Sequence, residues 1–334
     1  MPELRRDPII GRWVIIATER SRRPGGFSLN REPQGTVPCP FCPGNESKTP
    51  PEIWAVGQKN RVPNQPGWTT RVVPNKYPAL EIEGDLHRSS EDLFAKMDGL
   101  GAHEVIVETD DHNRQLEDLD DARAVDVLHA WRDRIVDLKK DKRFEYVLVF
   151  KNRGASAGAS VAHAHSQLIA TPMVPIRVKQ EIRGAEEYHE QKGRCIYCDI
   201  IQAELDKNER VVEHNDDFVV ITPFASRFAF EMWILPRVHA TDYDQMPESS
   251  YVSLAKILKK ALTRLNNVLD MPPYNFIIHT GPLKTNGLAH YHWHIELMPK
   301  IVHTAGFEWG AGFYINPTPP ELAARYLRDA LPDK

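Results

Sequence analysis

The chain has 334 residues, of which 41% are hydrophobic and 26% charged, and its formal net charge is −4. This length is enough for two domains or one duplicated domain, and the interspersed charges argue against nucleic acid as a partner. No apolar run is long enough to cross a bilayer, and the N-terminus lacks the apolar stretch of a secretory signal. We therefore expect a cytoplasmic globular protein that acts on a small molecule and needs neither nucleic acid nor membrane.

The first part of the chain combines a predicted strand hairpin at 9–18 with a long segment rich in Pro and Gly. Between them lies an arginine-rich turn that includes Arg20 and Arg23. Such arginines can clamp an anion, although a solvated loop explains the turn better when it is taken alone. Within the Pro-rich segment, Cys39 and Cys42 form a Cys-x-x-Cys turn, which suits two ligands of a tetrahedral metal site.

The rest of the first half is predicted to alternate strands with one helix. Apolar residues recur at helical spacing from 121 to 140 and indicate an amphipathic helix. Strands are predicted at 70–80, 104–109 and 145–150. The last of these strands delivers the chain to a loop of small residues.

This loop, from Asn152 to Gln167, is the most informative stretch of the sequence. Small residues allow backbone N–H groups to approach a phosphate, and His163 and His165 point to the same side of an extended segment. The combination predicts phosphoryl chemistry. The alternative for this stretch alone is a glycine-containing turn with two hydrogen-bonded histidines.

After a polar helical connector at 176–194, the same order of features returns. A Cys-x-x-Cys pair at Cys195/Cys198 is followed by a predicted helix at 199–208 and strands at 211–224 and 230–239. A long helix at 250–269, a strand at 274–278 and a His-x-His pair at His292/His294 then complete the repeat.

The separations are repeated as well as the order. His112 and His163 are 51 residues apart, and His239 and His292 are 53 residues apart. Repetition of both order and spacing predicts an internal duplication, with one half at 1–175 and the other at 176–334.

Each half supplies two cysteines and two histidines, the ligand set of a closed structural zinc site. We predict two zinc ions per chain, one bound by Cys39, Cys42, His112 and His163 and the other by Cys195, Cys198, His239 and His292. A buried or redox-active cysteine pair is the alternative, and His214 competes with His239 as a ligand. A metal on the first histidine of each His-x-His pair would hold the second histidine in place.

With His163 assigned to the metal, His165 is free and is the predicted catalytic nucleophile toward phosphorus. Gly158 and Ser160 are predicted to donate to the phosphate oxygens, and Gln167 is predicted to donate its amide from the same side. The product of this attack would be a nucleotidyl-histidine intermediate.

Two further residues refine this assignment. In the second half, His294 occupies the place of His165, but Trp293 beside it and a bulkier loop favour chemistry in the first half. Gln167 has no titratable proton and therefore suits a leaving group that departs without acid, such as a sugar phosphate. Transfer is thus favoured over hydrolysis.

The set His163-Ala-His165-Ser-Gln167, with Cys39-x-x-Cys42 and His112 upstream, resembles the galactose-1-phosphate uridylyltransferase family of the histidine-triad (HIT) superfamily. The resemblance implies an α+β fold of two HIT-like halves, which form one antiparallel half-barrel sheet with packed helices. It also implies a homodimer and transfer of UMP from UDP-glucose to galactose 1-phosphate by a ping-pong mechanism.

The same resemblance implies roles for individual residues. His165 would be the nucleophile, Ser160 and Gln167 would contact the phosphoryl group, and the remaining substrate contacts would be Arg20, Arg23, Asn75, Asn152, Gly158 and Glu308. Ala164, Ser166 and Lys76 depart from the familiar pattern, and Ser166 is also found in relatives that are ADP-glucose phosphorylases. The alternatives are therefore an ADP-glucose phosphorylase and, less favoured, a non-enzymatic zinc scaffold that binds nucleotides.

Overall fold

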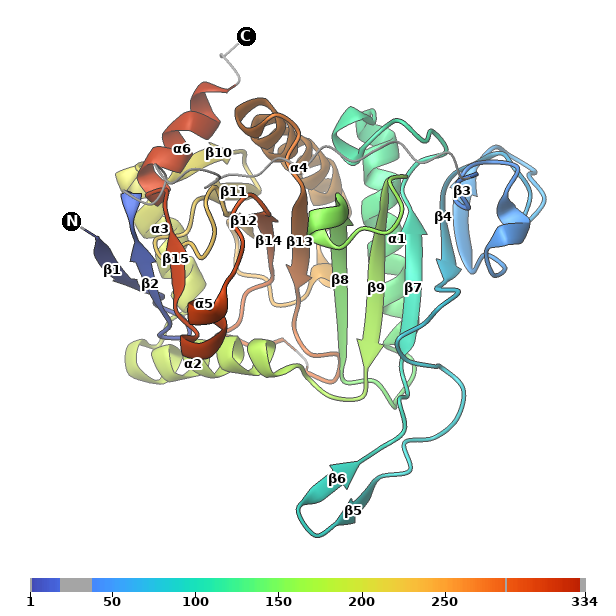
Figure 1. Ribbon diagram of the computed structural model, residues 1–334, viewed down its shortest axis with the longest axis horizontal. Coiled ribbons are helices and arrows are strands. Elements are labelled where there is room, and N and C mark those ends of the chain that lie inside the picture. The colour runs from blue at the N-terminus through green and yellow to red at the C-terminus, as the bar shows by residue number, and fades with distance from the viewer. Residues whose placement is uncertain (1, 19–37, 286, 331–334) are drawn as a thin grey trace.

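The centre of the molecule is a ten-stranded antiparallel sheet, described here from a computed structural model that covers residues 2–18, 38–285 and 287–330 (Figure 1). Its strand order is β10-β11-β12-β14-β13-β8-β9-β7-β4-β3. The strands of the first half are β3 Trp54–Gly57, β4 Trp68–Pro74, β7 Ala102–Val107, β8 Tyr146–Arg153 and β9 His165–Thr171. Those of the second half are β10 Val211–His214, β11 Phe218–Ile221, β12 Met232–Pro236, β13 Tyr274–His279 and β14 His294–Pro299.

The two halves of the sheet repeat one topology. Three strands are followed by a long helix and then by two strands that insert beside the third, which gives the orders β3-β4-β7-β9-β8 and β10-β11-β12-β14-β13. The long helices are α1 Asp121–Leu138 and α4 Glu248–Leu269. The halves join where β8 pairs antiparallel with β13. The predicted α+β fold with internal duplication is confirmed, whereas the boundary between residues 175 and 176 stays a prediction.

Both long helices cover the same face of the sheet, behind it in Figure 1, and pack against each other. In α1 the buried residues include Val127, Leu128, Trp131 and Ile135, at the spacing expected for one helix face. The Asp120 side chain caps the helix by accepting from the backbone N–H of Arg123 at 2.9 Å. The main hydrophobic core therefore lies between the helices and the sheet.

Smaller elements surround the second half of the sheet. They are the helices α2 Ile176–Lys192, α3 Ile196–Lys207, α5 Gly306–Ala311 and α6 Pro320–Asp329, and the three-stranded sheet of β1 Glu3–Arg6, β2 Trp13–Ile16 and β15 Tyr314–Asn316. A separate two-stranded arm, β5 Ser89–Glu91 with β6 Phe94–Lys96, extends below the main sheet in Figure 1. No helix in the described part of the chain is long and apolar enough to span a membrane.

Two expectations about strands were wrong, and each time an Asx turn is the reason. The N-terminal hairpin does not occupy 9–18, because the Asp7 side chain accepts from the N–H groups of Ile9 and Ile10 and bends the chain between β1 and β2. The segment 211–224 is divided into β10 and β11, because the Asn215 side chain accepts from the two N–H groups that follow the turn.

Candidate active site and metal centres

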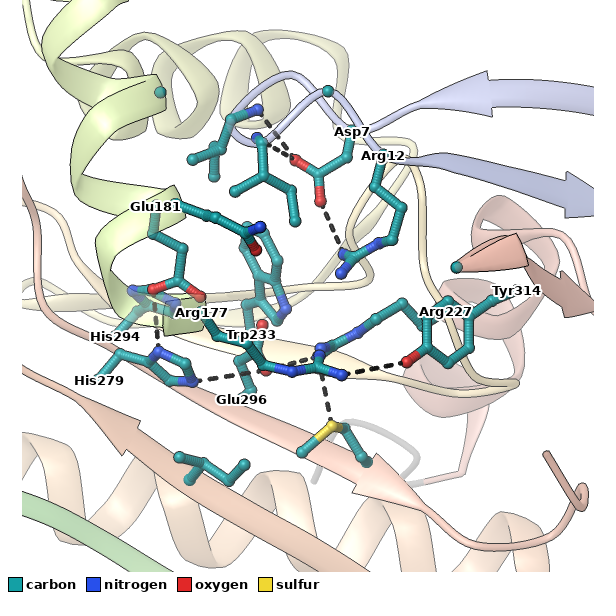
Figure 2. A pocket seen from close by; sticks show the side chains of 18 of the residues that line it. Asp7, Arg12, Arg177, Glu181, Arg227, Trp233, His279, His294, Glu296 and Tyr314 are labelled. Carbon is teal, nitrogen blue, oxygen red and sulfur yellow. Dashed lines mark hydrogen bonds and ion pairs between the residues drawn. The ribbon is translucent and has the colours of Figure 1, made fainter. Parts of the chain in front are cut away.

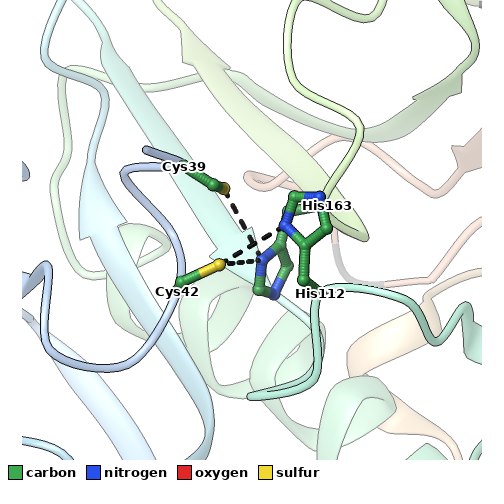
Figure 3. A group of neighbouring side chains, drawn as sticks. All are labelled: Cys39, Cys42, His112 and His163. Atoms are coloured by element: carbon green, nitrogen blue, oxygen red, sulfur yellow. Dashed lines mark hydrogen bonds between the residues drawn. The ribbon is translucent and has the colours of Figure 1, made fainter. Parts of the chain in front are cut away.

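The first predicted metal group is assembled from three separate segments of the first half (Figure 3). Cys39 and Cys42 come from the Pro-rich turn, His112 follows β7, and His163 precedes β9. Their ligand atoms all lie within 4.8 Å of one another. The Cys42 sulfur is 3.3 Å from His112 Nδ1 and 3.6 Å from His163 Nδ1, and the Cys39 sulfur is 3.7 Å from the same His163 nitrogen.

These distances suit a tetrahedral metal. With zinc–sulfur and zinc–nitrogen bonds of about 2.3 and 2.0 Å, two ligands on a tetrahedron are about 3.6 Å apart. The other nitrogen of His163, Nε2, lies 2.7 Å from the Thr109 carbonyl oxygen and donates to it. A carbonyl acceptor of this kind fixes the tautomer in which Nδ1 keeps its lone pair for a metal.

The second predicted metal group, in the other half, has the same construction. Cys198 lies 3.6 Å from His239 Nδ1 and 3.7 Å from His292 Nδ1, and His292 Nε2 donates to the Pro236 carbonyl at 2.9 Å. Cys195 completes the group, and His239 belongs to it rather than His214. The two histidine rings are nearly perpendicular in each half, at 87°. Both groups can therefore hold a zinc ion in a site closed by four protein ligands.

His165 is the first residue of β9 and follows the metal group by two positions. Its Nδ1 lies 2.7 Å from the His163 carbonyl oxygen, which can only accept, so Nδ1 carries the proton and Nε2 the lone pair. The side chain is 6% exposed, and burial lowers the pKa of His165 to about 4, with the hydrogen bond to His163 offsetting only part of this shift. The ring is thus neutral near pH 7, as a nucleophile requires.

Phe41 connects the metal group to His165. This residue stands between the two cysteines, and its ring centroid is 5.2 Å from that of His165 and 6.3 Å from that of His163. The Phe41 backbone N–H donates to the Cys39 sulfur at 3.4 Å. A metal that fixes the two thiolates therefore also fixes one wall of the space around His165, a contact that sequence reasoning missed.

Gln167 and Asn75 are brought together by another residue that sequence reasoning missed. His103 Nε2 lies 2.9 Å from Gln167 Oε1 and 3.1 Å from Asn75 Nδ2. Gln167 lies on the same side of β9 as His165, because residues two apart on a strand share a face. His103 is opposite Ile169 in the neighbouring strand, and Ile169 shares a face with His165 and Gln167. Alternation along the predicted strand could therefore have placed His103 on the same face as these residues.

The small-residue loop is organised around Asn152. Its Oδ1 accepts from Asn275 Nδ2 at 2.7 Å, and the same nitrogen donates to the Ala157 carbonyl at 2.8 Å. Gly158 has a φ of +92°, and a Cβ there would lie 3.7 Å from the Asn152 amide nitrogen. Asn152 and Gly158 are thus adjacent, and Ser160 is exposed in the following loop. The second half therefore supports the loop of the first through Asn275.

Comparison with known proteins extends this picture. Residues 1–175 match the family model described as "Galactose-1-phosphate uridyl transferase, N-terminal domain", and residues 181–309 match the corresponding C-terminal domain. The chain belongs to the galactose-1-phosphate uridylyltransferase family.

Two relatives in this family cover nearly the whole chain. An ADP-glucose phosphorylase of Arabidopsis thaliana is 37% identical over 98% of this chain and 93% of its own length. A galactose-1-phosphate uridylyltransferase of Thermotoga maritima is 30% identical over 98% of both chains. The crystal structure of the Arabidopsis enzyme with bound ADP-glucose superposes with a TM-score of 0.84, at 35% identity over 98% of this chain and 99% of that one.

One departure from the familiar family pattern has a structural explanation. Ser166 points away from the ligand face, and its Oγ accepts from the indole N–H of Trp131 in α1 at 2.8 Å. This buried hydrogen bond ties the start of β9 to the helix layer. A glycine at this position would leave the indole N–H without its acceptor.

Three residues that the family resemblance placed in the site are not brought to His165 by the described chain. Glu308 lies in α5, over the second half of the sheet, and its carboxylate accepts from the Ala305 N–H of its own helix at 3.1 Å (Figure 1). Arg20 and Arg23 lie outside the described residues. Their roles stay predictions.

The second half contains an altered counterpart of the candidate site, at the floor of a cavity of about 1370 Å³ (Figure 2). His294 takes the place of His165, and its ring stacks on that of His279 with centroids 4.8 Å apart. His279 Nδ1 is 3.0 Å from a Glu181 oxygen, and Nε2 is 3.5 Å from a Glu296 oxygen. Burial alone lowers the pKa of His279, but the two carboxylates outweigh it and raise this pKa to about 10.

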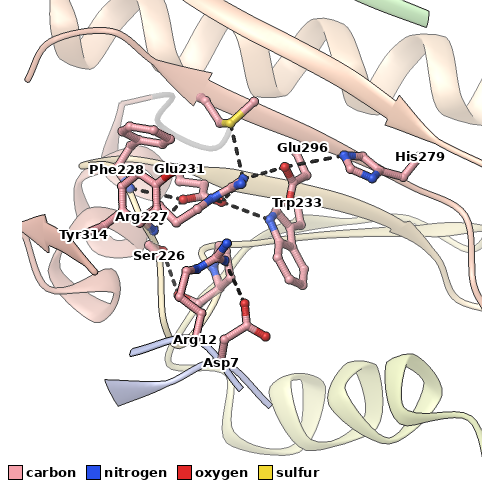
Figure 4. Close-up of polar contacts among 12 residues, drawn as sticks. Asp7, Arg12, Ser226, Arg227, Phe228, Glu231, Trp233, His279, Glu296 and Tyr314 are labelled. Atoms are coloured by element: carbon pink, nitrogen blue, oxygen red, sulfur yellow. Dashed lines mark hydrogen bonds and ion pairs between the residues drawn. The ribbon is translucent and has the colours of Figure 1, made fainter. Parts of the chain in front are cut away.

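The charge of His279 bears on metal binding. Glu181, His279 and His294 are close enough to share an ion, but a histidine that is protonated on both nitrogens has no lone pair to offer. Figure 4 shows the continuation of this network, in which Arg227 contacts both Glu231 and Glu296. The arrangement is that of a buried ion-pair network in place of a phosphate site.

Proposed function

We propose that this protein transfers a nucleotidyl group from a nucleotide sugar through His165, with ADP-glucose as the donor and inorganic phosphate as the acceptor. The observation that carries the proposal is the hydrogen bond from His165 Nδ1 to the His163 carbonyl. It leaves the Nε2 lone pair free, in a ring that begins β9, shares a face with Gln167 and packs against Phe41.

The chemistry takes place in two displacements. His165 Nε2 attacks the α-phosphorus of ADP-glucose, the phosphorus–oxygen bond to the β-phosphate breaks, and glucose 1-phosphate leaves with the bonding electrons. A phosphate oxygen then attacks the same phosphorus, the phosphorus–nitrogen bond breaks, and ADP forms while the electron pair returns to Nε2. Donors from Gln167, Ser160 and the loop around Gly158 would stabilise the charge on the phosphoryl oxygens in both steps.

The choice of donor rests on similarity and on two residues. The sequence by itself favoured UDP-glucose and galactose 1-phosphate, with ADP-glucose second. The 37% identity to an ADP-glucose phosphorylase, which aligns with 98% of this chain, supports ADP-glucose as the first candidate donor, as do Ser166 and Lys76. Uridylyl transfer to galactose 1-phosphate remains the second candidate, because the Thermotoga uridylyltransferase is 30% identical over 98% of the chain.

Zinc is proposed at both Cys₂His₂ groups, in a structural role. All four positions of each tetrahedron are supplied by protein, so neither ion has an open position for substrate. The first group would hold His163 and Phe41, and through them the nucleophile. The second group would hold His292 and, through it, His294, the counterpart of His165.

Labelling of the protein itself tests the proposal. The enzyme is incubated with ADP-glucose or UDP-glucose that carries a radioactive α-phosphate, without an acceptor, and the acid-labile, base-stable label on the protein is counted. We expect label from ADP-glucose in the wild type and none in His165→Ala. His294→Ala is the matched control, because it removes the equivalent histidine of the other half and should retain labelling.

The acceptor is identified by a chase of the labelled enzyme. Phosphate should release the label as ADP, while galactose 1-phosphate should leave it on the protein. Faster labelling by UDP-glucose and release by galactose 1-phosphate would establish the second candidate instead. A wild type that takes no label from either donor would refute nucleotidyl transfer.

A further inference from the structure

The protonation state of His103 follows from its hydrogen bonds. The Ala79 backbone N–H, which can only donate, lies 3.0 Å from His103 Nδ1. Nδ1 therefore carries the lone pair, and in a neutral imidazole the proton is on Nε2. Because Nε2 lies 2.9 Å from Gln167 Oε1, His103 donates this hydrogen bond and the Gln167 carbonyl accepts it.

This hydrogen bond decides which end of the Gln167 amide faces the site. An amide side chain can be turned by 180° with little change in shape, and the two orientations present opposite dipoles. With Oε1 held by His103, the Gln167 NH₂ group is the end left to reach a phosphoryl oxygen near His165. In the reverse orientation, a carbonyl oxygen would face phosphate oxygens and repel them.

Asn75 is oriented by the same arrangement. Its Oδ1 accepts from the Tyr77 backbone N–H at 2.9 Å, so its amide nitrogen is the end that lies 3.1 Å from His103 Nε2. Because Nε2 already carries a proton, the Asn75 nitrogen packs against the ring without donating to it. Its hydrogens are left for a ligand on the same face.

The second half carries different residues at the counterparts of both position 103 and position 167. Gln167 pairs with Val105 and Glu296 pairs with Trp233, so His103 and Glu231 are equivalent positions, each two residues before the pairing partner. In the second half both positions are glutamates, and Arg227 bridges them (Figure 4). Both halves therefore join these two positions by polar contacts. In the first half His103 and Gln167 form a direct hydrogen bond, and in the second the charged Arg227 bridges Glu231 and Glu296.

We propose that His103 is a positioning residue, which donates from Nε2 to Gln167 and thereby turns the Gln167 amide N–H groups toward the transferred phosphoryl group. The inference rests on the proposed function, since it assigns His103 a part in stabilising the phosphoryl group at His165. It does not depend on whether the nucleotide is an adenylate or a uridylate.

The test measures the rate of labelling in a single turnover with radioactive nucleotide sugar at saturating concentration. His103→Phe keeps a ring but removes the donor, and it should slow labelling at least about tenfold, as for the loss of a transition-state donor, with a smaller change in KM. His103→Gln restores a donor and should recover part of the rate. In a Gln167→Ala background, His103→Phe should cause no further loss, because its effect passes through Gln167.

A control and a direct measurement complete the design. His214→Phe replaces an exposed histidine outside the site and should label at the wild-type rate. Nitrogen-15 NMR of the imidazole side chains should find the His103 proton on Nε2, and this readout needs no activity.

The outcomes separate the two proposals. If the wild type takes no label, the proposed function fails whatever His103 does. If the wild type is labelled, then an unchanged rate in His103→Phe, independent effects of the two substitutions, or a proton on Nδ1 would each overturn the positioning role.

Discussion

At the scale of single residues, the candidate site depends on how each ring is held. Three histidines lie in or beside strands β7 and β9, and each has its tautomer fixed by a different backbone group. The Thr109 carbonyl fixes His163, the His163 carbonyl fixes His165, and the Ala79 N–H fixes His103. Gln167 takes its orientation from the third of them. Chemically equivalent side chains thus acquire separate tasks through one hydrogen bond each.

Phe41 provides a prediction at this scale. In Phe41→Ala the two cysteines remain, so zinc content should be unchanged, but the ring that packs on His165 is lost. Because a small misplacement of a reacting group can cost one to two orders of magnitude, labelling should slow by about ten- to hundredfold. Phe41→Leu should lose less. Equal labelling rates in Phe41→Ala and the wild type would contradict the proposed link between the Cys39/Cys42 turn and His165.

His279 provides a second prediction, for the pH dependence of stability. Its pKa of about 10 in the folded protein exceeds that of an unfolded histidine, so its contribution to the free energy of unfolding is fully present below about pH 6.5 and is lost as the pH rises through 10. Facing groups are Glu181 from α2, Glu296 and His294 from β14, and Arg227 beyond Glu296.

Denaturant unfolding between pH 6 and pH 10 measures this contribution. His279→Gln should be less stable than the wild type by about 3 kcal/mol at pH 6, because it leaves the Glu181 carboxylate without its charged partner, although Glu296 keeps Arg227, and its stability should fall less steeply toward pH 10. His214→Gln, at an exposed position, serves as the control. Parallel stability profiles for the wild type and His279→Gln would show that His279 is not charged in the folded protein.

At the scale of elements, each metal group ties a Cys-x-x-Cys pair, in a turn in the first half and at the start of α3 in the second, to the ends of strands. In the first half the ligands follow β7 and precede β9, and in the second they follow β12 and precede β14. In each half the end of one strand is thus clamped to the start of its neighbour, and the antiparallel pairing of β9, β8, β13 and β14 places the two clamps at opposite ends of the sheet. The first clamp lies beside His165, the candidate nucleophile, and the second lies beside a buried ion-pair network.

Elemental analysis of the purified protein tests the metal content. We expect two zinc ions per chain and no third, because His279 is protonated beside Glu181 and Glu296. Cys39→Ser should lose one zinc and most of the labelling activity, whereas Cys198→Ser should lose one zinc and keep most of the labelling. Loss of both ions in either variant would contradict two independent sites.

At the scale of the whole molecule, the position of α5 bears on the predicted homodimer. Glu308 is on α5, which also exposes Phe307 and Trp309, at 50% and 75%, and lies over the half of the sheet opposite β9. Exposed aromatic side chains clustered on one short helix are typical of an interface. If Glu308 binds the sugar, it therefore reaches the His165 site of a partner in a homodimer.

Mixed dimers test this arrangement. His165→Ala and Glu308→Ala are each expected to be inactive or severely impaired. When the two are unfolded and refolded together in equal amounts, half of the dimers are mixed and each contains one intact site, so about a quarter of the wild-type activity should return. Recovery that stays at the level of the separate variants would place Glu308 outside the partner's site.

The sequence by itself determined the features that depend on spacing along the chain. Period-two alternation put His163 and His165 on one side of an extended segment, and repeated separations revealed the duplication, because both are properties of local geometry. The repeated spacing also sorted four cysteines and four histidines into two groups, and in the structure the ligand atoms of each group lie within 4.8 Å of one another.

Only the tertiary structure decided which strands become neighbours and which atoms meet between them. The contacts of His103 with Gln167, of Phe41 with His165 and of Asn275 with Asn152 join residues 64 to 124 positions apart, and no local pattern links them. The same is true of the tautomers of His163 and His103, because their partners, the Thr109 carbonyl and the Ala79 N–H, belong to other segments of the chain. Spacing thus identified the candidate nucleophile, and only the three-dimensional structure showed that the backbone bends so that the His163 carbonyl accepts from its Nδ1 and leaves Nε2 free.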